Sequence, residues 1–169
     1  MTGAYPLDID SDNVLDLVVL RRGSTHVLRG LGGCSFEDAT TSLGLDLGND
    51  WTVAFSATWE AGAALPTLAF GNYLVPETYD CADSELWRPT TDGYNSPIAL
   101  TSHCTLSMLF SDWNNDGNID LRASNDRNYD REAREQLWRI RDGETPREYT
   151  EADGWRKVVI WGMGIASYD

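Results

Sequence analysis

The chain has 169 residues, which is enough for one domain with a core of its own. Hydrophobic residues make up 41% and charged residues 24%, an ordinary globular composition. The 13 basic and 27 acidic residues give a formal charge of −14, which disfavours nucleic acid and anionic lipid as partners because binding phosphates relies on Lys and Arg. An acidic surface suits cations or basic partners instead.

Export and redox state are only partly readable from the sequence. No run of about 18 apolar residues exists, so no membrane insertion is expected. The first residues, MTGAYPLDID, lack the regions of a signal peptide, which leaves open export with a leader that has been removed. Three cysteines fit neither a disulfide-dense scaffold nor a CxxC zinc site. A Cys81–Cys104 bridge that leaves Cys34 free is one arrangement among several.

The first predicted element is an acidic loop, DIDSDNVLD at 8–16, which leads into the apolar run LDLVVL at 15–20. Oxygen-bearing side chains stand at alternate positions, and a tight turn would point them to one centre. All-oxygen ligation is what Ca²⁺ takes. Asn13 stands where the turn needs left-handed backbone, which Asn tolerates. The predicted ligands are Asp8, Asp10, Asp12, the carbonyl of Val14, and Asp16.

Strand-like segments follow, and their order recurs along the chain. A Leu-Arg strand ends at Arg29, Arg88 and Arg139, spaced by 59 and 51 residues. Runs of small and apolar residues occupy 51–57, 105–112 and 161–169. The repeating unit is a small-apolar strand, an acidic loop, an apolar strand, the Leu-Arg strand and an aromatic-acidic strand. The approximate repeats are 1–50, 51–104 and 105–160, with the start of another at 161–169.

Four short strands with turns in each repeat are typical of a β-propeller blade. The sequence therefore predicts an all-β chain of about three four-stranded antiparallel repeats in a single domain. The best helix candidate, 129–138, lies between two strand motifs and is interpreted as a loop or hairpin. Closed propellers typically carry about four to eight blades. We expect a segment of a larger propeller, or one that covers its sheet edges by assembling with other chains.

The second and third repeats differ in their loops. The middle stretch, ATWEAGAALPT at 57–67, lacks the carboxylates and is expected to turn without metal. The third, DWNNDGNIDL at 112–121, restores them around a glycine that permits a sharp turn. No His or Cys lies in either acidic loop, which disfavours zinc and copper, and Mg²⁺ prefers more water ligands. The predicted ligands of the third loop are Asp112, Asn114, Asp116, the carbonyl of Asn118, and Asp120.

A solvated polar turn is the alternative for one such loop, but two loops in phase with a repeat favour metal. An EF-hand is excluded because strands flank the loop and Ala123 stands where the last ligand of an EF-hand would be.

Both acidic loops resemble the calcium loops of FG-GAP (VCBS-type) repeats, the blades of integrin-α-like propellers. The stretches VLRGLGGCSFEDATTSLGLD and LAFGNYL resemble bacterial relatives of the cartilage acidic protein (ASPIC/UnbV) group. The resemblance implies a secreted, periplasmic or cell-surface seven-bladed propeller with structural Ca²⁺ and a role in adhesion or protein binding. The chain departs from the family by its short length, its degenerate middle loop and the absence of a C-terminal extension.

Little in the sequence indicates catalysis. His26 and His103 are scattered, and no nucleophile motif is present, so a non-enzymatic protein is predicted. Trp59 and Trp113 lie in loops, where exposed rings could seat a sugar or a peptide. A lectin-like propeller, or a polysaccharide-acting enzyme built on one, is therefore the alternative. The tryptophans of the repeat strands, expected in the core, are Trp51, Trp87, Trp138 and Trp161.

Overall fold

A computed structural model describes residues 1–126, 133–156 and 158–167. In these ranges, twelve strands form three four-stranded antiparallel sheets. The first sheet contains β1 (Gly3–Leu7), β2 (Asp16–Leu20), β3 (His26–Gly32) and β4 (Ser35–Asp38). The second contains β5 (Thr52–Thr58), β6 (Thr67–Asn72), β7 (Ser84–Trp87) and β8 (Ile98–Leu100). The third contains β9 (Thr105–Ser111), β10 (Asp120–Asn125), β11 (Gln136–Arg139) and β12 (Arg147–Glu148), followed by a 3-10 turn, η1 (Glu151–Asp153).

Each sheet joins strands that are consecutive in the chain, and each lies within one predicted repeat. The all-β class and the four antiparallel strands per repeat are confirmed. The same register recurs: Leu17 pairs with Leu28, Leu68 with Trp87, and Leu121 with Trp138. In every sheet an arginine follows the second member of this pair. Equivalent positions of the three sheets can therefore be compared directly.

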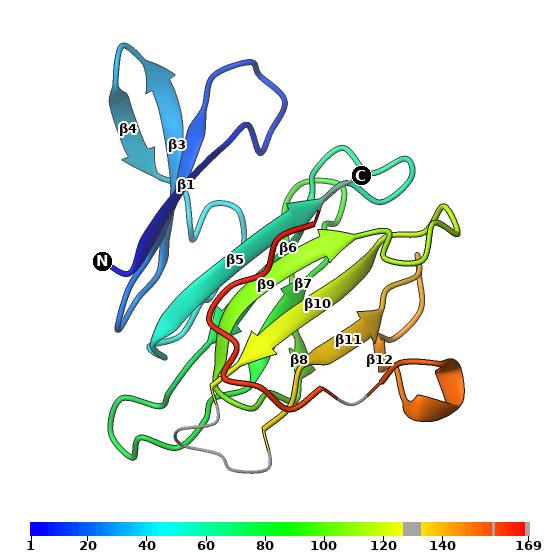
Figure 1. Ribbon diagram of the computed structural model, residues 1–169. Coiled ribbons are helices and arrows are strands. Elements are labelled where there is room, and N and C mark those ends of the chain that lie inside the picture. Colours follow the sequence, from blue (N-terminus) through cyan, green and yellow to red (C-terminus); the bar gives the residue numbers. More distant parts are fainter. Residues whose placement is uncertain (127–132, 157, 168–169) are drawn as a thin grey trace.

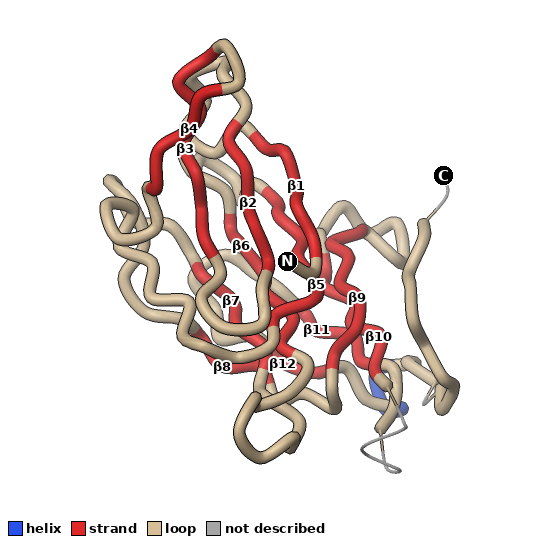
Figure 2. The backbone as a smooth tube through the Cα atoms, turned by 90° about the vertical axis from the view of Figure 1, so that its left-hand side faces the viewer, coloured by secondary structure: helices blue, strands red, loops and turns tan. Residues whose placement is uncertain are grey.

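The first strands of the sheets are neighbours in space. β5 contacts β1 and β2 on one side and β9 on the other (Figure 1). The view turned by 90° shows β5 beside β9 as well, with β3 and β4 at the far end of the first sheet (Figure 2). Every residue of β4 is exposed. The sheets therefore meet through their first strands and leave their last strands toward the outside.

The second sheet is the middle layer, and both its faces are buried. All six residues of β6 are buried. Because side chains alternate along a strand, Leu68 and Phe70 pack in the core shared with the first sheet, whereas Ala69 packs in the core shared with the third. A Cβ on Gly71 would lie 2.8 Å from a methyl carbon of Thr105, so glycine permits the close approach of β9.

A disulfide joins the second and third sheets. Cys81, between β6 and β7, is bonded to Cys104, which immediately precedes β9, and Cys34 is free and exposed. The arrangement that the sequence left open is thus the one observed. No helix in the described ranges is long and apolar enough to cross a membrane.

Two expectations for the C-terminal part need correction. Residues 161–167 form no strand, and Trp161 is 64% exposed rather than in the core. Residues 168–169 and the first four residues of the helix candidate, 129–132, lie outside the described residues, whereas 136–139 form β11. Trp87 and Trp138 are buried as predicted. The exposed tryptophan has no neighbouring fourth sheet to pack against in the described chain.

Candidate metal centre

The first acidic loop joins β1 to β2 and gathers three carboxylates. Oxygen atoms of Asp8, Asp10 and Asp16 all lie within 4.8 Å of one another. Asp16 is 3% exposed, and the other two are partly buried. Negative charges about 4 Å apart repel by roughly 4 kcal/mol at an effective dielectric constant near 20. Such a group favours a cation at its centre or a positive side chain beside it.

Backbone N–H groups fix the shape of this loop. Both oxygens of Asp8 accept hydrogen bonds, from the N–H of Asp12 at 3.1 Å and of Asn13 at 3.0 Å. Asp16 accepts from an N–H within the loop and from that of Gly30 in β3, both at 2.8 Å. Asn13 has a φ of 65°, the left-handed conformation expected for it. The predicted ligands therefore also build the turn.

The third-sheet loop, between β9 and β10, has the same hydrogen-bond pattern. Asp112 accepts from the N–H of Asp116 at 3.0 Å and of Gly117 at 2.8 Å, the same two positions as in the first loop. Asp120 accepts from the N–H of Ile140, which is equivalent to Gly30 of the first sheet, at 3.3 Å. Gly117 has a φ of 83°. The two loops are thus copies at the level of the backbone.

The loops differ in whether an oxygen is left without a donor. Asp10 Oδ1 is buried and has no hydrogen-bond partner among the described residues. Its other oxygen, Oδ2, lies 2.6 Å from Nη2 of Arg29, whose side chain is 47% exposed. A buried anionic oxygen without a donor is costly. A cation held by Asp8, Asp10 and Asp16 would satisfy it, so this loop fits a hard cation that takes oxygen ligands.

In the third loop, the positive charge beside the carboxylates comes from an arginine. Arg141 places Nη1 2.6 Å from Asp120 Oδ1 and Nη2 3.5 Å from Asp116 Oδ2. Asp120 is fully buried, and its second oxygen accepts from Trp113 Nε1 at 2.9 Å and from the Tyr149 hydroxyl at 3.0 Å. Within the described ranges, only the first loop brings three acidic oxygens within 4.8 Å of one another.

The other predicted ligands lie around these groups. Asp12 is exposed, and its Oδ1 accepts from the Val14 N–H at 2.7 Å. Asn118 donates its backbone and side-chain N–H groups to Asp116 Oδ1 at 2.8 and 3.0 Å, and Asn114 donates to Oδ2 at 3.1 Å. These donors, led by the Asn118 side chain, hold the pKa of Asp116 below its usual value. Asp116 is therefore already stabilised as an anion without a metal.

The second-sheet loop has the same length but different chemistry. Thr67 stands where the other loops have their last aspartate, and its hydroxyl donates to Glu60 Oε1 at 2.6 Å. The same oxygen lies 2.9 Å from Nε of Arg88, and both charged side chains are largely buried. Glu60 Oε2 is buried without a donor, but no group of three acidic oxygens in the described chain includes it. An ion pair between its own residues closes this loop.

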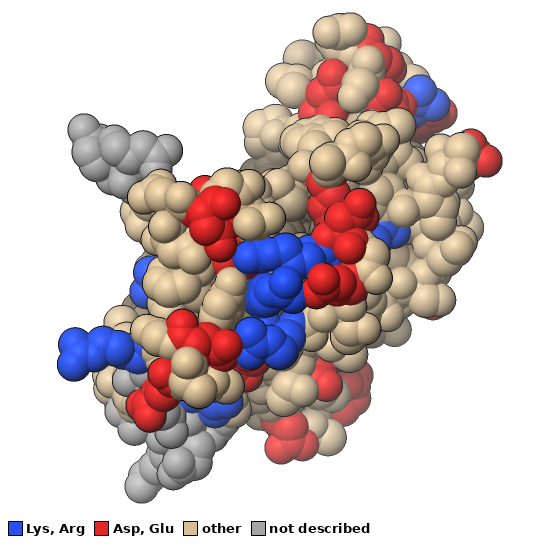
Figure 3. All heavy atoms as spheres, turned by 90° about the vertical axis from the view of Figure 1, so that its right-hand side faces the viewer, with Lys and Arg blue, Asp and Glu red and all other residues tan. Residues whose placement is uncertain are grey.

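The structure adds side chains that sequence reasoning did not identify. Arg88 was recognised as part of the repeat, but not as the partner of Glu60. Its guanidinium also donates to the carbonyl oxygens of Arg141, at 2.6 Å, and of Glu144, and so links the second and third sheets. Arg141 follows the third Leu-Arg motif by two residues, and no spacing pointed to it. Basic side chains gathered among acidic ones are visible on one face of the molecule (Figure 3).

A histidine–aspartate pair is also present, but it lacks a free base. His26 Nδ1 lies 2.7 Å from Asp38 Oδ2, while Nε2 lies 3.2 Å from Nη1 of Arg21. Hydrogen bonds from Thr40, followed by His26, hold the pKa of Asp38 below its usual value. The nitrogen that would accept a proton from a nucleophile already faces a cationic donor. This arrangement does not have the form of a catalytic triad.

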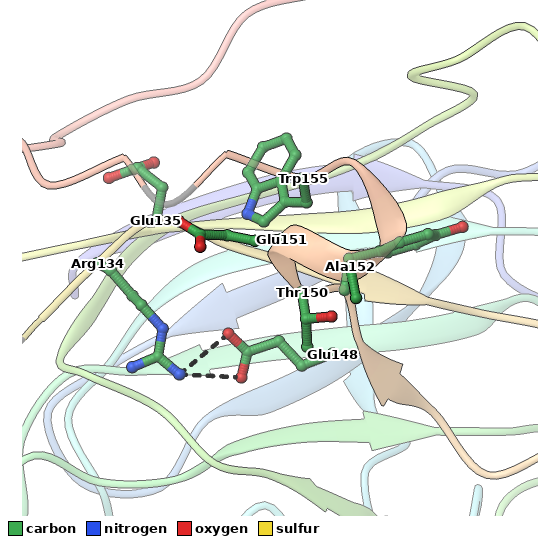
Figure 4. Close-up of a pocket in the computed structure, with 8 residues that line it drawn as sticks. Arg134, Glu135, Glu148, Thr150, Glu151, Ala152 and Trp155 are labelled. Carbon is green, nitrogen blue, oxygen red and sulfur yellow. Dashed lines mark hydrogen bonds and ion pairs between the residues drawn. The ribbon is translucent and has the colours of Figure 1, made fainter.

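A cavity of about 450 Å³ opens beside η1 in the third sheet (Figure 4). Arg134 on its wall pairs with Glu148 at 3.3 Å. Burial raises the pKa of Glu135, although hydrogen bonds from Ser124 and Asn125 oppose this shift. Among the described residues that line the cavity, no side chain is a cysteine, histidine or serine. The cavity thus combines an ion pair, a buried carboxylate and the ring of Trp155.

No family model matches the chain, and no curated protein matches its sequence. The family resemblance therefore remains an expectation from the quoted motifs.

Proposed function

We propose that this chain is a calcium-binding, non-enzymatic segment of a β-propeller in an exported or cell-surface protein, where it binds a protein partner or serves as a scaffold. Three consecutive four-stranded sheets that meet through their first strands are the arrangement expected of neighbouring blades. The middle sheet is covered on both faces, as a blade inside a larger propeller would be. The proposal includes completion of the propeller by further blades or by self-association of the chain.

The observation that carries the metal assignment is the buried Asp10 Oδ1 without a donor, beside the carboxylates of Asp8 and Asp16. These three residues would hold the cation, and backbone carbonyls and water would supply further oxygens, since Ca²⁺ takes six to eight. The bound ion would neutralise the clustered charges and fix the turn between β1 and β2. Its role is structural.

Export is supported by the Cys81–Cys104 disulfide. Disulfides form and persist in oxidising compartments such as the periplasm and the cell exterior. Extracellular calcium would also be available to a site exposed there.

Thermal melts in EDTA, in about 2 mM CaCl₂ and in MgCl₂ test the proposal. At a hundredfold excess over the dissociation constant, one site adds about 2.7 kcal/mol. For a chain of this size that corresponds to a rise in Tm of roughly 5–10 °C. Asp10→Ala should abolish most of this rise, whereas Asp46→Ala, which removes an exposed carboxylate outside the loops, should preserve it.

The proposal would be wrong if calcium did not shift the melt, if magnesium produced an equal shift, or if Asp10→Ala kept the full effect.

A carbohydrate-binding function is the second candidate, and it rests on Trp59. This side chain is 45% exposed at the edge of a hollow of about 320 Å³, where Asn118 and Arg141 offer polar groups. Exposed rings of this kind stack on sugars. Binding on a glycan array that Trp59→Ala removes would favour this function over protein binding.

A further inference from the structure

Arg141 lies at a place that distinguishes the third sheet from the first. In the third sheet, the N–H of Ile140 holds the last loop aspartate, and Arg141 follows it. In the first sheet, Gly30 has that role and Leu31 follows it. Thr90 stands at the corresponding place in the second sheet when positions are counted from the shared register. Only one of the three sheets thus has a positive charge at this position.

The guanidinium of Arg141 is held inside the third loop. Its side chain is 15% exposed, and it contacts Asp120, which is fully buried, and Asp116. The side chain of Arg29 in the first sheet is 47% exposed and contacts Asp10 Oδ2. The other oxygen, Asp10 Oδ1, is the one that is buried without a donor. The arginine of the first loop thus leaves an inner oxygen without a donor, whereas that of the third loop contacts the innermost carboxylate.

The second sheet gives a precedent within the same chain. Arg88 pairs with Glu60 and closes a loop that has lost its aspartates. The third loop combines both features, because it keeps the aspartates and also has an inward arginine. A cation bound to the same carboxylates would lie close to the guanidinium, and the two positive charges would repel each other.

We propose that Arg141 is a built-in counter-ion of the third loop and sets the order in which the two loops take calcium. The first loop fills at low calcium concentration, and the third fills only when Arg141 leaves Asp116 and Asp120. Arg141 therefore sets the affinity of the third loop for calcium. The inference rests on the proposed calcium function.

The experiment isolates each loop with one substitution. Asp112→Ala removes the first ligand of the third loop and leaves the first loop, and Asp8→Ala does the reverse. Isothermal titration with CaCl₂ then measures one dissociation constant in each protein. We expect the Asp112→Ala protein to bind more tightly than the Asp8→Ala protein.

Arg141→Gln in the Asp8→Ala background should tighten calcium binding roughly tenfold, equivalent to 1.4 kcal/mol. Arg139→Gln in the same background is the matched control. It removes the same charge two residues earlier, at the end of β11, but Arg139 pairs with Glu144 and not with a loop carboxylate. Its dissociation constant should equal that of the Asp8→Ala parent. Arg141→Lys, which keeps the charge, should shift the constant less than Arg141→Gln.

A second measurement does not depend on how the Arg141 variants fold. NMR follows the Nε–H resonance of Arg141 in the Asp8→Ala protein during a calcium titration. Release of the guanidinium should change this resonance with the same midpoint as calcium binding. A resonance that stays fixed while calcium binds overturns the inference.

The outcomes separate the two proposals. If the Asp112→Ala protein does not bind calcium, the proposed function fails and the inference fails with it. If that protein binds but Arg141→Gln leaves the third loop unchanged, or if Arg139→Gln tightens binding equally, only the inference fails. Absence of any calcium binding in both the Asp8→Ala protein and its Arg141→Gln variant also overturns the inference.

Discussion

The loops of the first and third sheets share their backbone hydrogen bonds but differ in what balances the charge of their carboxylates. In each, the first aspartate accepts N–H groups from the fifth and sixth positions, and the last accepts one from Gly30 in β3 or from Ile140 just after β11. The first loop leaves a buried oxygen of Asp10 without a donor. The third has Arg141 against its innermost carboxylate. The spacing of the aspartates therefore specifies the turn, while a residue outside the loop decides how the charge of the aspartates is balanced.

The second sheet extends the comparison to a loop without aspartates. Glu60 and Arg88 form an ion pair there, and Arg88 also contacts the carbonyl oxygen of Arg141 in the next sheet. An arginine contacts a carboxylate in each of the three loops, but among the two loops with aspartates only the first leaves a buried carboxylate oxygen without a donor. The predictions below test whether these differences are energetic as well as geometric.

The largest effect is expected from removing the last aspartate of each acidic loop. Asp120→Ala should lower the free energy of unfolding by about 3–5 kcal/mol in EDTA, because the Trp113 and Tyr149 donors lose their acceptor and Arg141 loses its buried charged partner. Asp16→Ala should cost about 2 kcal/mol in EDTA, since only two backbone N–H groups lose their acceptor. Urea denaturation measures both.

Calcium should bring the two losses closer together. The loss in Asp16→Ala should grow when about 2 mM CaCl₂ is present, because the cation no longer stabilises the variant. Equal losses for the two variants in EDTA would contradict the difference in electrostatic design between the loops.

An intermediate effect is expected in the second sheet. Glu60→Gln should lower the free energy of unfolding by about 1–2 kcal/mol, because Arg88 loses a charged partner in a largely buried place. The loss should be the same in EDTA and in CaCl₂. Glu144→Gln is the control, since its pair with Arg139 is more exposed and should contribute less than about 0.5 kcal/mol. A calcium-dependent loss in Glu60→Gln would show that this loop also holds a cation.

The smallest effect concerns a buried carboxylate outside the loops, Glu135. Burial raises its pKa above the ordinary value of 4.5 in the folded state. Well below pH 4.5 the group is protonated in both states, so burial then carries no penalty for its charge. As the pH rises above 4.5, the unfolded state ionises first, and stability falls until the folded pKa is passed. Glu135→Gln should therefore raise the Tm by about 2 °C at pH 7 and leave it unchanged at pH 4.

Thermal melts at the two pH values check this expectation. A variant less stable than the wild type at pH 7 would mean that the ionised carboxylate is stabilised by its hydrogen bonds from Ser124 and Asn125 more than it is destabilised by burial.

Local patterns in the sequence determined the all-β class, the four strands of each repeat and the turn of the two acidic loops. These features depend on alternation along strands and on side chains that contact backbone a few residues away. The left-handed conformations of Asn13 and Gly117 follow from the same short-range constraints. The exposed Trp161 was wrongly expected in the core because its burial needs a neighbour that local sequence does not supply.

Only the tertiary structure decided how the charges of the loops are balanced. Asp120 meets Arg141 and Tyr149 from positions 21 and 29 residues away, and Glu60 meets Arg88 from 28 residues away. The disulfide, too, was one arrangement of several until the second and third sheets brought Cys81 and Cys104 together. Long-range pairing depends on where the sheets pack, and with 13 basic residues among 27 acidic ones, composition alone does not say which charges meet.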